Sequence, residues 1–400
     1  MVKRFTGSFT QQAAIPESAV AAAVEVMQSG RLHRYNIAEG EVPEVALLEA
    51  EYAKWQGSRY CLALTSGGQA MQIALRAAGV EPGDHVLTNG FTLAPVPGAI
   101  AAVGAIPRLV EITPDLTLDL ADLEAKAMGA KALLLSNMRG HLCDMDALMA
   151  LCNRLGLPVI EDCAHTMGAL WNGTRSGSFG LSGCFSTQTY KHMNSGEGGF
   201  LTSDDPAFMA RAIMLSGSYM LYARHGAAPP PEAFRDARLD TPNMSARMDN
   251  LRAAILRPQL AEIEANLKAW TDRHDWIAEG LRGTPGLRMA TRPEAETYVG
   301  SSLQFCLDGI SPQAAQALLK GSADRGVELK WFGAKDPVGF TSAHQSWRYV
   351  PAQSLPKTDA ILAGLFDLRV PLTFTEADCH LIAEILSEEV AALQIAPAPQ

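Results

Sequence analysis

The stretch Phe185-Ser-Thr-Gln-Thr-Tyr-Lys191-His-Met-Asn-Ser-Gly-Glu-Gly-Gly199 places a hydroxyl five residues before a lysine and ends in a glycine cluster. A lysine that forms a Schiff base must lie near an aldehyde with its amine partly neutral. A nearby serine can donate to a phosphate, and glycines let the backbone approach closely. The layout is typical of a lysine that holds pyridoxal phosphate, although a surface lysine beside a turn has the same short pattern.

A carboxylate follows a predicted strand about thirty residues upstream of this lysine. The apolar run from Pro158 to Ile160 indicates a short buried strand, and Asp162 stands at its end. In an open parallel sheet, ligands lie at the carboxyl ends of the strands. Asp162 is therefore placed to pair with a pyridine nitrogen, and His165 to reach a ring oxygen. A helix cap and an interior histidine are the respective alternatives.

A third candidate element is the glycine turn after the apolar run at residues 60–64. Ser66, Gly67 and Gly68 precede apolar residues that recur with helical spacing. A strand, a glycine turn and a helix N-terminus together form an anion site, although an ordinary strand-to-helix turn has the same appearance. The chain has neither a Walker A motif nor a dinucleotide fingerprint, which argues against nucleotide hydrolysis and nicotinamide chemistry.

Taken in this order, the three elements resemble the fold-type I pyridoxal-phosphate enzymes. The chain is most similar to the DegT-type family of sugar aminotransferases, over roughly residues 25 to 385. Further segments that carry the resemblance are Ser29-Gly-Arg-Leu32, Gly79-Val-Glu-Pro-Gly-Asp84, Gly140-His-Leu-Cys-Asp144, Glu161-Asp-Cys-Ala-His-Thr-Met-Gly168 and Arg247-Met-Asp-Asn-Leu-Arg-Ala-Ala254.

The resemblance implies a role for each matching residue. Lys191 becomes the Schiff-base lysine, and Asp162 becomes the partner of the pyridine nitrogen. Arg247 falls on an Arg-Met segment that, in such dimers, approaches the active site from the neighbouring subunit. The remaining cofactor contacts implied are His165 beside the ring and, at the phosphate, Ser186 with the backbone of Gly67 and Gly68.

Four departures from the family pattern concern the surroundings of the cofactor. Gly68 stands where a Thr is common, so the phosphate turn loses one hydroxyl donor and depends more on backbone N–H groups. Leu93 stands where an aromatic residue usually stacks on the ring, so either Phe91 or an aliphatic side chain makes that contact. Ser245 replaces an Asn that often precedes the Arg-Met pair, which affects the contact between subunits. Asn137-Met-Arg139-Gly140 stands where the family typically reads His-Leu-Tyr-Gly, and this change indicates a different substrate.

Composition fits a globular enzyme. The chain has 400 residues, of which 48% are apolar and 19% are charged. A net charge of -10 argues against a nucleic-acid surface. Seven scattered cysteines fit a reducing compartment, so we expect a cytoplasmic protein. No pair among Cys143, Cys163 and His165 has zinc-site spacing, and neither a signal peptide nor a membrane span is visible, so we expect no metal and no membrane partner.

Alternating strands and helices from about residue 60 to 215 predict a doubly wound, mostly parallel sheet. Three consecutive prolines, Pro229 to Pro231, predict a loop, and a long helix over residues 252–281 then leads to a smaller C-terminal α/β domain. We expect a large cofactor-binding domain over residues 1–255 and a small domain over 256–400. The predicted strands are residues 86–88, 106–111, 132–135, 159–161, 199–202 and 301–307, and further helices are residues 119–128, 145–155 and 376–393.

The resemblance implies an aminotransferase that moves an amino group from glutamate to a keto-sugar or a related polyhydroxylated ketone, working as a homodimer. Relatives that deoxygenate sugars have a histidine in place of the lysine, whereas this chain keeps Lys191. A lyase, a decarboxylase or a racemase shares both the Schiff base and the ring-nitrogen carboxylate, so these activities stay open as alternatives.

Overall fold

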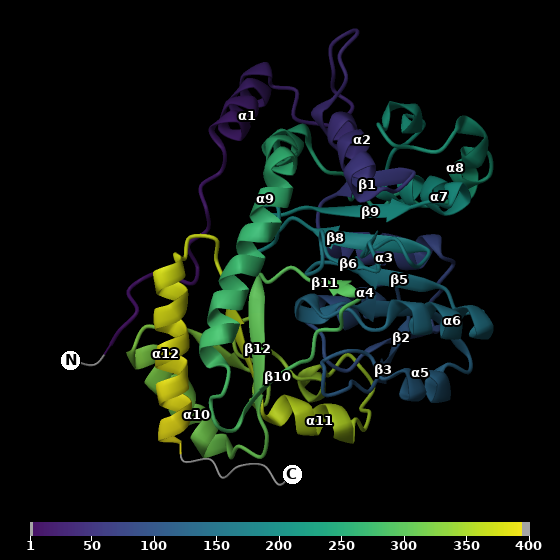
Figure 1. The fold of residues 1–400 in the computed structure, drawn as a ribbon. Helices are drawn as coiled ribbons and strands as arrows, with labels where there is room; N and C mark the ends of the chain where they lie inside the picture. Colours follow the sequence, from purple (N-terminus) through teal and green to yellow (C-terminus); the bar gives the residue numbers. More distant parts are fainter. Residues whose placement is uncertain (1–2, 394–400) are drawn as a thin grey trace.

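A seven-stranded sheet forms the centre of the computed structural model, which describes residues 3–393 (Figure 1). Only β9 runs antiparallel to its neighbours, and the other pairs are parallel. The predicted mostly parallel, doubly wound sheet is therefore confirmed. The strands in spatial order are β1 (Tyr60–Leu64), β9 (Gly199–Ser203), β8 (Ser182–Ser186), β5 (Val159–Asp162), β4 (Ala130–Ser136), β2 (His85–Asn89) and β3 (Ile106–Val110).

Helices cover both faces of this sheet and bury an apolar core on each side. The helix α6 (Met145–Leu155) illustrates the local cause. Asp144 accepts a hydrogen bond from the N–H of Ala147 at 2.9 Å and caps its start, and Gly156 ends it with φ 63°. Such a cap stabilises a helix by about 1 kcal/mol. The other covering helices are α2 (Glu44–Gln56) and α5 (Leu120–Lys126) on the α6 face, and α3 (Gly67–Ala77), α4 (Pro95–Ala102) and α7 (Pro206–Ser216) on the opposite face.

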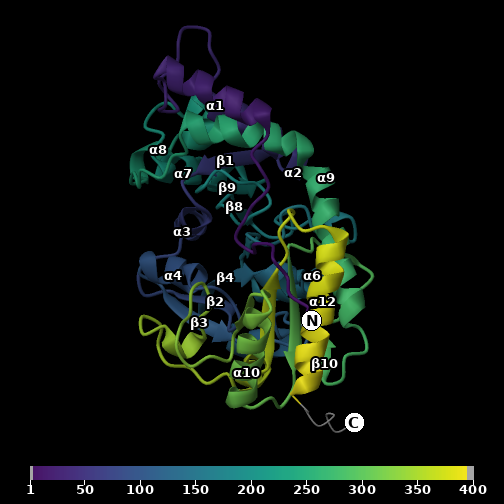
Figure 2. The ribbon, with the colours of Figure 1, turned by 90° about the vertical axis from the view of Figure 1, so that its left-hand side faces the viewer.

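The 32-residue helix α9 (Asn250–Leu281) connects the large domain to the small one. The carboxylate of Asp249 accepts a hydrogen bond from the N–H of Arg252 and caps its start. α1 (Glu17–Ser29) packs against α9 from the large-domain side, and α12 (Glu376–Ala392) packs along it in the small domain (Figure 2). The division that we expect at residue 255 falls within α9 and stays a prediction.

The small domain contains a four-stranded antiparallel sheet in the order β10-β12-β14-β13. Its core includes two residues from the start of the chain, Phe5 and Phe9, whose rings pack edge-on against Phe374. The elements are β10 (Leu287–Met289), β12 (Ser302–Leu307), β13 (Leu329–Trp331), β14 (Leu365–Arg369), α10 (Pro312–Asp324) and α11 (Pro356–Ala363).

Smaller elements join these layers. The proline run leads into a single 3-10 turn, η3 (Pro231–Phe234). No helix within residues 3–393 combines the length and the apolar character needed to cross a membrane. The other short elements are β6 (Leu170–Trp171), β7 (Thr174–Arg175) and β11 (Glu296–Thr297), which form a three-stranded sheet, and η1 (Met138–Gly140), η2 (Tyr222–Arg224), α8 (Ala237–Asp240) and η4 (His344–Ser346).

Candidate active site

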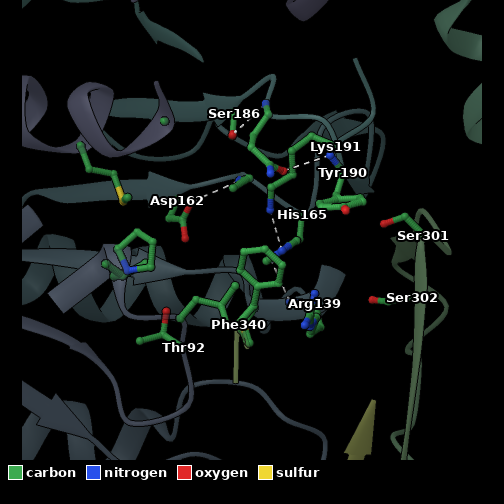
Figure 3. A pocket seen from close by; sticks show the side chains of 18 of the residues that line it. Thr92, Arg139, Asp162, His165, Ser186, Tyr190, Lys191, Ser301, Ser302 and Phe340 are labelled. Carbon is green, nitrogen blue, oxygen red and sulfur yellow. Dashed lines mark hydrogen bonds between the residues drawn. The ribbon is translucent and has the colours of Figure 1, made fainter. Parts of the chain in front are cut away.

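A cavity of about 330 Å³ lies at the carboxyl edge of the large sheet, where the small domain meets it (Figure 3). Ser136, Asp162 and Ser186 end the strands β4, β5 and β8, and because these strands are parallel, all three residues reach the same edge. Ser302, at the start of β12, lines the cavity from the small domain. The cavity therefore brings together residues that are far apart in the sequence.

Lys191 projects into this cavity and contacts His165. The distance between Lys191 Nζ and His165 Nε2 is 2.7 Å. Burial and the positive charge of Arg139 lower the pKa of Lys191 to about 7, although the Asp162 carboxylate acts in the opposite direction. A large fraction of the amine is therefore neutral near pH 7, which is the form that attacks a carbonyl.

His165 is neutral, and its surroundings select one tautomer. Burial, followed by the positive charges of Lys191 and Arg139, lowers its pKa well below the ordinary value. The N–H of Arg139 points at His165 Nδ1 across 3.4 Å, so Nδ1 is the acceptor and the ring proton lies on Nε2. The hydrogen bond to Lys191 is therefore donated by His165 Nε2–H to a neutral amine.

Asp162 is 6% exposed at the end of β5 and lies in the same cavity. Its carboxylate accepts hydrogen bonds from Ser136 Oγ at 3.3 Å and from the N–H of Ala164 at 3.2 Å. Thr92 Oγ1 lies 2.7 Å from Ser136 Oγ and orients it. Burial raises the pKa of Asp162, and the charge of Lys191 opposes this effect. A bound cationic ring nitrogen would stabilise the carboxylate in the same way as Lys191 does.

The start of α3 forms a cradle for an anion beside Ser186. Ser66 Oγ accepts the hydrogen bond from the N–H of Gln69, and the preceding N–H groups belong to the first helical turn, which has no intrahelical acceptors. A Cβ atom on Gly67 would come within 2.9 Å of Ser186 Cβ, so the cradle accommodates only glycine without moving Ser186. A phosphate fits this combination of helix N-terminus and hydroxyl.

These groups fit pyridoxal phosphate as a set. Lys191 supplies a partly neutral amine for the aldehyde, Asp162 a buried carboxylate for the ring nitrogen, and the start of α3 an anion cradle for the phosphate. Lys191, Asp162, His165, Ser186 and Gly67 all line the cavity. Gly68 follows in the first turn of α3 but does not line it.

The two candidates for the ring contact differ in position. Leu93 lines the cavity, whereas Phe91 is 1% exposed and packs edge-on against Phe332 at a centroid distance of 5.0 Å. Two aromatic residues that we did not expect from the sequence, Tyr190 and Phe340, also line the cavity, and their ring centroids lie 6.1 Å apart. Tyr190 directly precedes Lys191, and this adjacency is the one signal that the sequence offered for it.

Arg247 and Ser245 lie outside the cavity of their own chain. Arg247 Nη1 donates a hydrogen bond to the carbonyl oxygen of Gly217 at 2.9 Å, and its guanidinium lies 5.6 Å from the centroid of the Tyr219 ring. Ser245 is exposed and adopts φ 51°, a left-handed conformation that Asn and Gly adopt more readily. Neither residue is brought to Lys191 within one chain.

Arg139 and Arg369 line the cavity and were not among the expected site residues. Arg139 belongs to the turn η1 and forms an ion pair with Asp367, with 2.9 Å between Nη2 and Oδ2. Arg369 ends β14, and its guanidinium lies 3.6 Å from the centroid of the Tyr190 ring. The departure of Asn137-Met-Arg139-Gly140 from the family pattern pointed to the first arginine, whereas no sequence motif pointed to the second.

Comparison with known proteins gives a consistent family assignment. The sequence profile described as the DegT/DnrJ/EryC1/StrS aminotransferase family matches residues 14–387. The chain is 33% identical over 286 residues to dTDP-3-amino-3,4,6-trideoxy-alpha-D-glucose transaminase from Streptomyces venezuelae, and the match covers 69% of each chain. It is 31% identical over 293 residues to L-glutamine:2-deoxy-scyllo-inosose aminotransferase from Streptomyces lividus, covering 72% of this chain and 67% of the relative.

A solved structure extends the similarity to the fold. The crystal structure of DesV from S. venezuelae superimposes with a TM-score of 0.78 at 27% identity, covering 93% of this chain and 94% of that chain. Both domains of the chain therefore have counterparts in a protein of known structure. The family match over residues 14–387 includes the strands that end at Asp162 and Ser186, which supply the candidate cofactor site.

Proposed function

Because this chain belongs to the DegT/DnrJ/EryC1/StrS aminotransferase family, we propose that Lys191 holds pyridoxal phosphate for amino transfer to a keto-sugar or a related polyhydroxylated ketone. The observation that carries the proposal is the position of the Lys191 amine, 2.7 Å from a neutral His165 and in the same cavity as the buried Asp162. A nucleophilic amine and a carboxylate for a ring nitrogen are the two groups that this chemistry requires.

The residues of the cavity divide the work of holding the cofactor. When bound, pyridoxal phosphate supplies an aldehyde that condenses with amines and a ring that accepts the electron pair left on the substrate carbon. Asp162 would pair with the ring nitrogen and stabilise its proton. Ser186 and the first turn of α3 would bind the phosphate, and Leu93, which lines the cavity, would pack against the ring. Phe91 supports this wall from the domain junction behind the cavity.

Lys191 has a second task once the donor amine replaces it on the cofactor. The freed Nζ has a pKa near neutrality, so it accepts a proton from the substrate carbon and returns it in the next step. The hydrogen bond from His165 Nε2–H holds the free Nζ through its only lone pair, and it breaks when Nζ accepts the proton from the substrate carbon. One amine thus serves as the anchor and as the acid-base group.

The donor and the acceptor follow from the relatives. We expect glutamate as the amino donor, and glutamine is the alternative because the relative from S. lividus is named for it. The two curated relatives are named for a deoxyamino sugar nucleotide and for an inosose, which supports a cyclic polyhydroxylated ketone as acceptor. A lyase, a decarboxylase or a racemase would use the same lysine and carboxylate, but the family match favours amino transfer.

Absorbance of the purified protein tests this function. Protein loaded with pyridoxal phosphate should show a Schiff-base band near ~420 nm, and glutamate or glutamine should convert it to the amine form with release of the 2-oxo acid. Lys191→Ala should lack the band, whereas Lys268→Ala, at an exposed lysine paired with Asp272, should keep it. Borohydride reduction that fixes the cofactor to another lysine, or donor-independent decarboxylation, would contradict the proposal.

The cysteines support a cytoplasmic location as part of the same proposal. All seven are buried and free of disulfide bonds. Free thiols persist in reducing compartments, whereas secreted proteins tend to oxidise them. Fractionation of the producing cells, with the protein detected by antibody, tests this location.

A further inference from the structure

One face of the small-domain sheet is polar, and two of its residues, Ser302 and Arg369, line the active-site cavity. Across the sheet, Gln304 pairs with Asp367 and Asp367 pairs with Lys330, so the three form one cross-strand row. Ser302 pairs with Arg369 in the next row on the same face. The intervening residues of these strands, such as Leu303 and Leu368, point to the opposite face and belong to the small-domain core. The polar face therefore results from the alternation of polar and apolar residues along the strands of the sheet.

Positive charge exceeds negative charge on this face. Asp367 is fully buried and receives Arg139 at 2.9 Å, Lys330 at 3.4 Å and a hydrogen bond from Gln304 at 2.8 Å. Arg369 has no carboxylate within ion-pair distance among residues 3–393. One carboxylate therefore faces three cations, and the pKa values of Lys330 and Arg369 are lowered, first by burial and then in part by the charge of Arg139.

Arg139 keeps unused hydrogen-bond donors although it is 8% exposed. Its Nε makes no hydrogen bond to any described residue, and its Nη2 meets Asp367 at ion-pair distance without hydrogen-bond geometry. The backbone of Arg139 adopts φ 55°, a left-handed conformation that costs about 1 kcal/mol for a residue with a side chain. Buried donors without acceptors and a strained backbone occur together at ligand sites.

The other charged groups that line the cavity do not compensate the arginines. Asp162 and Lys191 are committed to the cofactor in the proposed function. Glu197 lines the cavity from the loop before β9, but it is exposed, so water screens its carboxylate. The positive charge on Arg139 and Arg369 is therefore not balanced by the other residues that line the cavity, and a bound anion would balance it.

We infer that Arg139 and Arg369 bind a carboxylate of the amino acceptor, so that the preferred acceptor is a cyclic ketone that carries a carboxylate near its carbonyl. This inference rests on the proposed function and narrows its substrate class. Two guanidinium groups match a planar carboxylate through paired hydrogen bonds. Arg139 and Arg369 line the same cavity as Lys191, and the charge of each lowers its pKa, so a carboxylate bound by the two guanidinium groups lies close to the reacting amine. A nucleotide phosphate that is distant from the ketone carbonyl would lie too far from the reacting amine to be this anion.

The donor alone does not account for the cluster. In a two-step transfer the donor and the acceptor occupy the same cavity in turn, and the α-carboxylate of the donor leaves with the first product. The arginines stay charged in the second step, so a neutral acceptor would leave Arg369 without a carboxylate partner and the Nε donor of Arg139 without an acceptor. A site with unpaired polar groups discriminates strongly against a ligand that cannot satisfy them.

Calorimetric binding of a matched ligand pair tests the inference. The protein is loaded directly with pyridoxamine phosphate and titrated with 3-oxocyclohexane-1-carboxylate or with the corresponding carboxamide, which differ in charge but hardly in shape. The carboxylate should bind at least about tenfold more tightly, the scale of a charge-assisted hydrogen bond. Arg369→Gln should remove most of this preference without leaving a buried carboxylate unpaired, and Arg139→Gln should act in the same direction.

Two further variants complete the design. Arg139→Lys keeps the charge and should retain part of the preference, and Arg154→Gln, at an exposed arginine paired with Glu124, should leave it unchanged. Equal affinity for the two ligands, no binding of either, or full preference in both glutamine variants would overturn the inference. Loading with pyridoxamine phosphate bypasses the donor, so failure of amino transfer from glutamate would count against the proposed function alone.

Discussion

Lys191 Nζ accepts a hydrogen bond from His165 Nε2 over 2.7 Å, and the backbone N–H of Arg139 fixes the imidazole by donating to its Nδ1. This pairing requires that both side chains are neutral. Burial lowers the pKa of each group, and the charge of Lys191 lowers the pKa of His165 further. The site therefore keeps a large fraction of the lysine in its neutral form near pH 7, before any substrate arrives.

The first prediction concerns the pH dependence of cofactor attachment. The rate at which cofactor-free protein forms the Schiff base should rise with pH and level off above about 7, because the pKa of Lys191 is lowered to that value. His165→Gln keeps a neutral donor and should preserve the midpoint, whereas His165→Ala admits water and should move it upward. Absorbance after mixing at a series of pH values measures the midpoint. A wild-type rate that keeps rising toward the ordinary pKa of lysine, 10.5, would refute the arrangement.

The second prediction separates the chemistry of Asp162 from cofactor binding. The carboxylate stabilises the ring proton most when electrons flow into the ring, so Asp162→Asn should cut turnover by orders of magnitude. Cofactor content should stay near that of the wild type because the α3 cradle still holds the phosphate. Steady-state rates and the bound cofactor after gel filtration give the two quantities. Near-normal turnover would exclude the assigned role, and parallel loss of cofactor would indicate a structural carboxylate.

Site residues were predictable from the sequence where a chemically suitable side chain stands at the end of a recognisable strand. Asp162 was predictable because an apolar run ends at it, and α6 was predictable because Asp144 and Gly156 mark its limits. β8 was missed since its sequence, Ser-Gly-Cys-Phe-Ser, contains no β-branched residue, and only its position between β5 and β9 makes it a strand. The tertiary context determines whether such a segment forms a strand.

The small-domain contribution to the cavity was not predictable for a different reason. In β14 apolar and charged residues alternate, which indicates a strand with one polar face. The strand alone does not reveal that Asp367 on this face is fully buried, because Arg139, which pairs with it, lies more than two hundred residues upstream in another domain. Phe5 and Phe9 also belong to the small-domain core, although they are far in sequence from the C-terminal residues that they pack against. This position too depends on tertiary packing rather than on a local pattern.

The third prediction concerns stability far from the cavity. Arg34 and Glu49 form a bidentate ion pair with both distances 2.9 Å, and their side chains are 1% and 0% exposed. Arg34→Met would leave the carboxylate buried with a weaker set of partners, so the free energy of unfolding should fall by about 3 kcal/mol. Arg31→Met removes the exposed pair with Glu41 and should change it by less than about 1 kcal/mol. Urea unfolding measures both, and equal effects would contradict the prediction.

The same pair gives the third prediction a pH signature. Burial raises the pKa of Glu49, but the charge of Arg34, with hydrogen bonds from Arg34 and His225, outweighs it and lowers the value from 4.5 to about 2. Because the pKa is lower in the folded state, the unfolded chain binds more protons between these values. The contribution is therefore complete above pH 4.5 and is lost as the pH falls toward 2. The stability difference between wild type and Arg34→Met should shrink over this interval, and a constant difference would assign it to packing.

The last prediction is that the working unit is a homodimer in which Arg247 serves the cavity of the partner subunit. Arg247 lies outside the cavity of its own chain and beside Tyr219, which is 56% exposed. Met220, the next residue in the chain after Tyr219, is 60% exposed. The family resemblance assigns Arg247 to a site shared between two subunits. Exposed apolar residues close to it are typical of an interface between two copies of the chain. Lys191→Ala and Arg247→Ala should each be inactive, for different reasons.

Mixing the two variants under subunit exchange should restore activity, because each hybrid dimer contains one site in which both residues are wild type. With random pairing, half of the dimers are hybrids, so about a quarter of the sites should be active. Lys191→Ala mixed with Asp162→Asn is the matched control. These residues act in the same chain's cavity, so every site of that hybrid keeps one lesion and no activity should return. Recovery in the control, no recovery in the test after exchange is verified with tagged chains, or an active monomer in sedimentation would each refute the shared site.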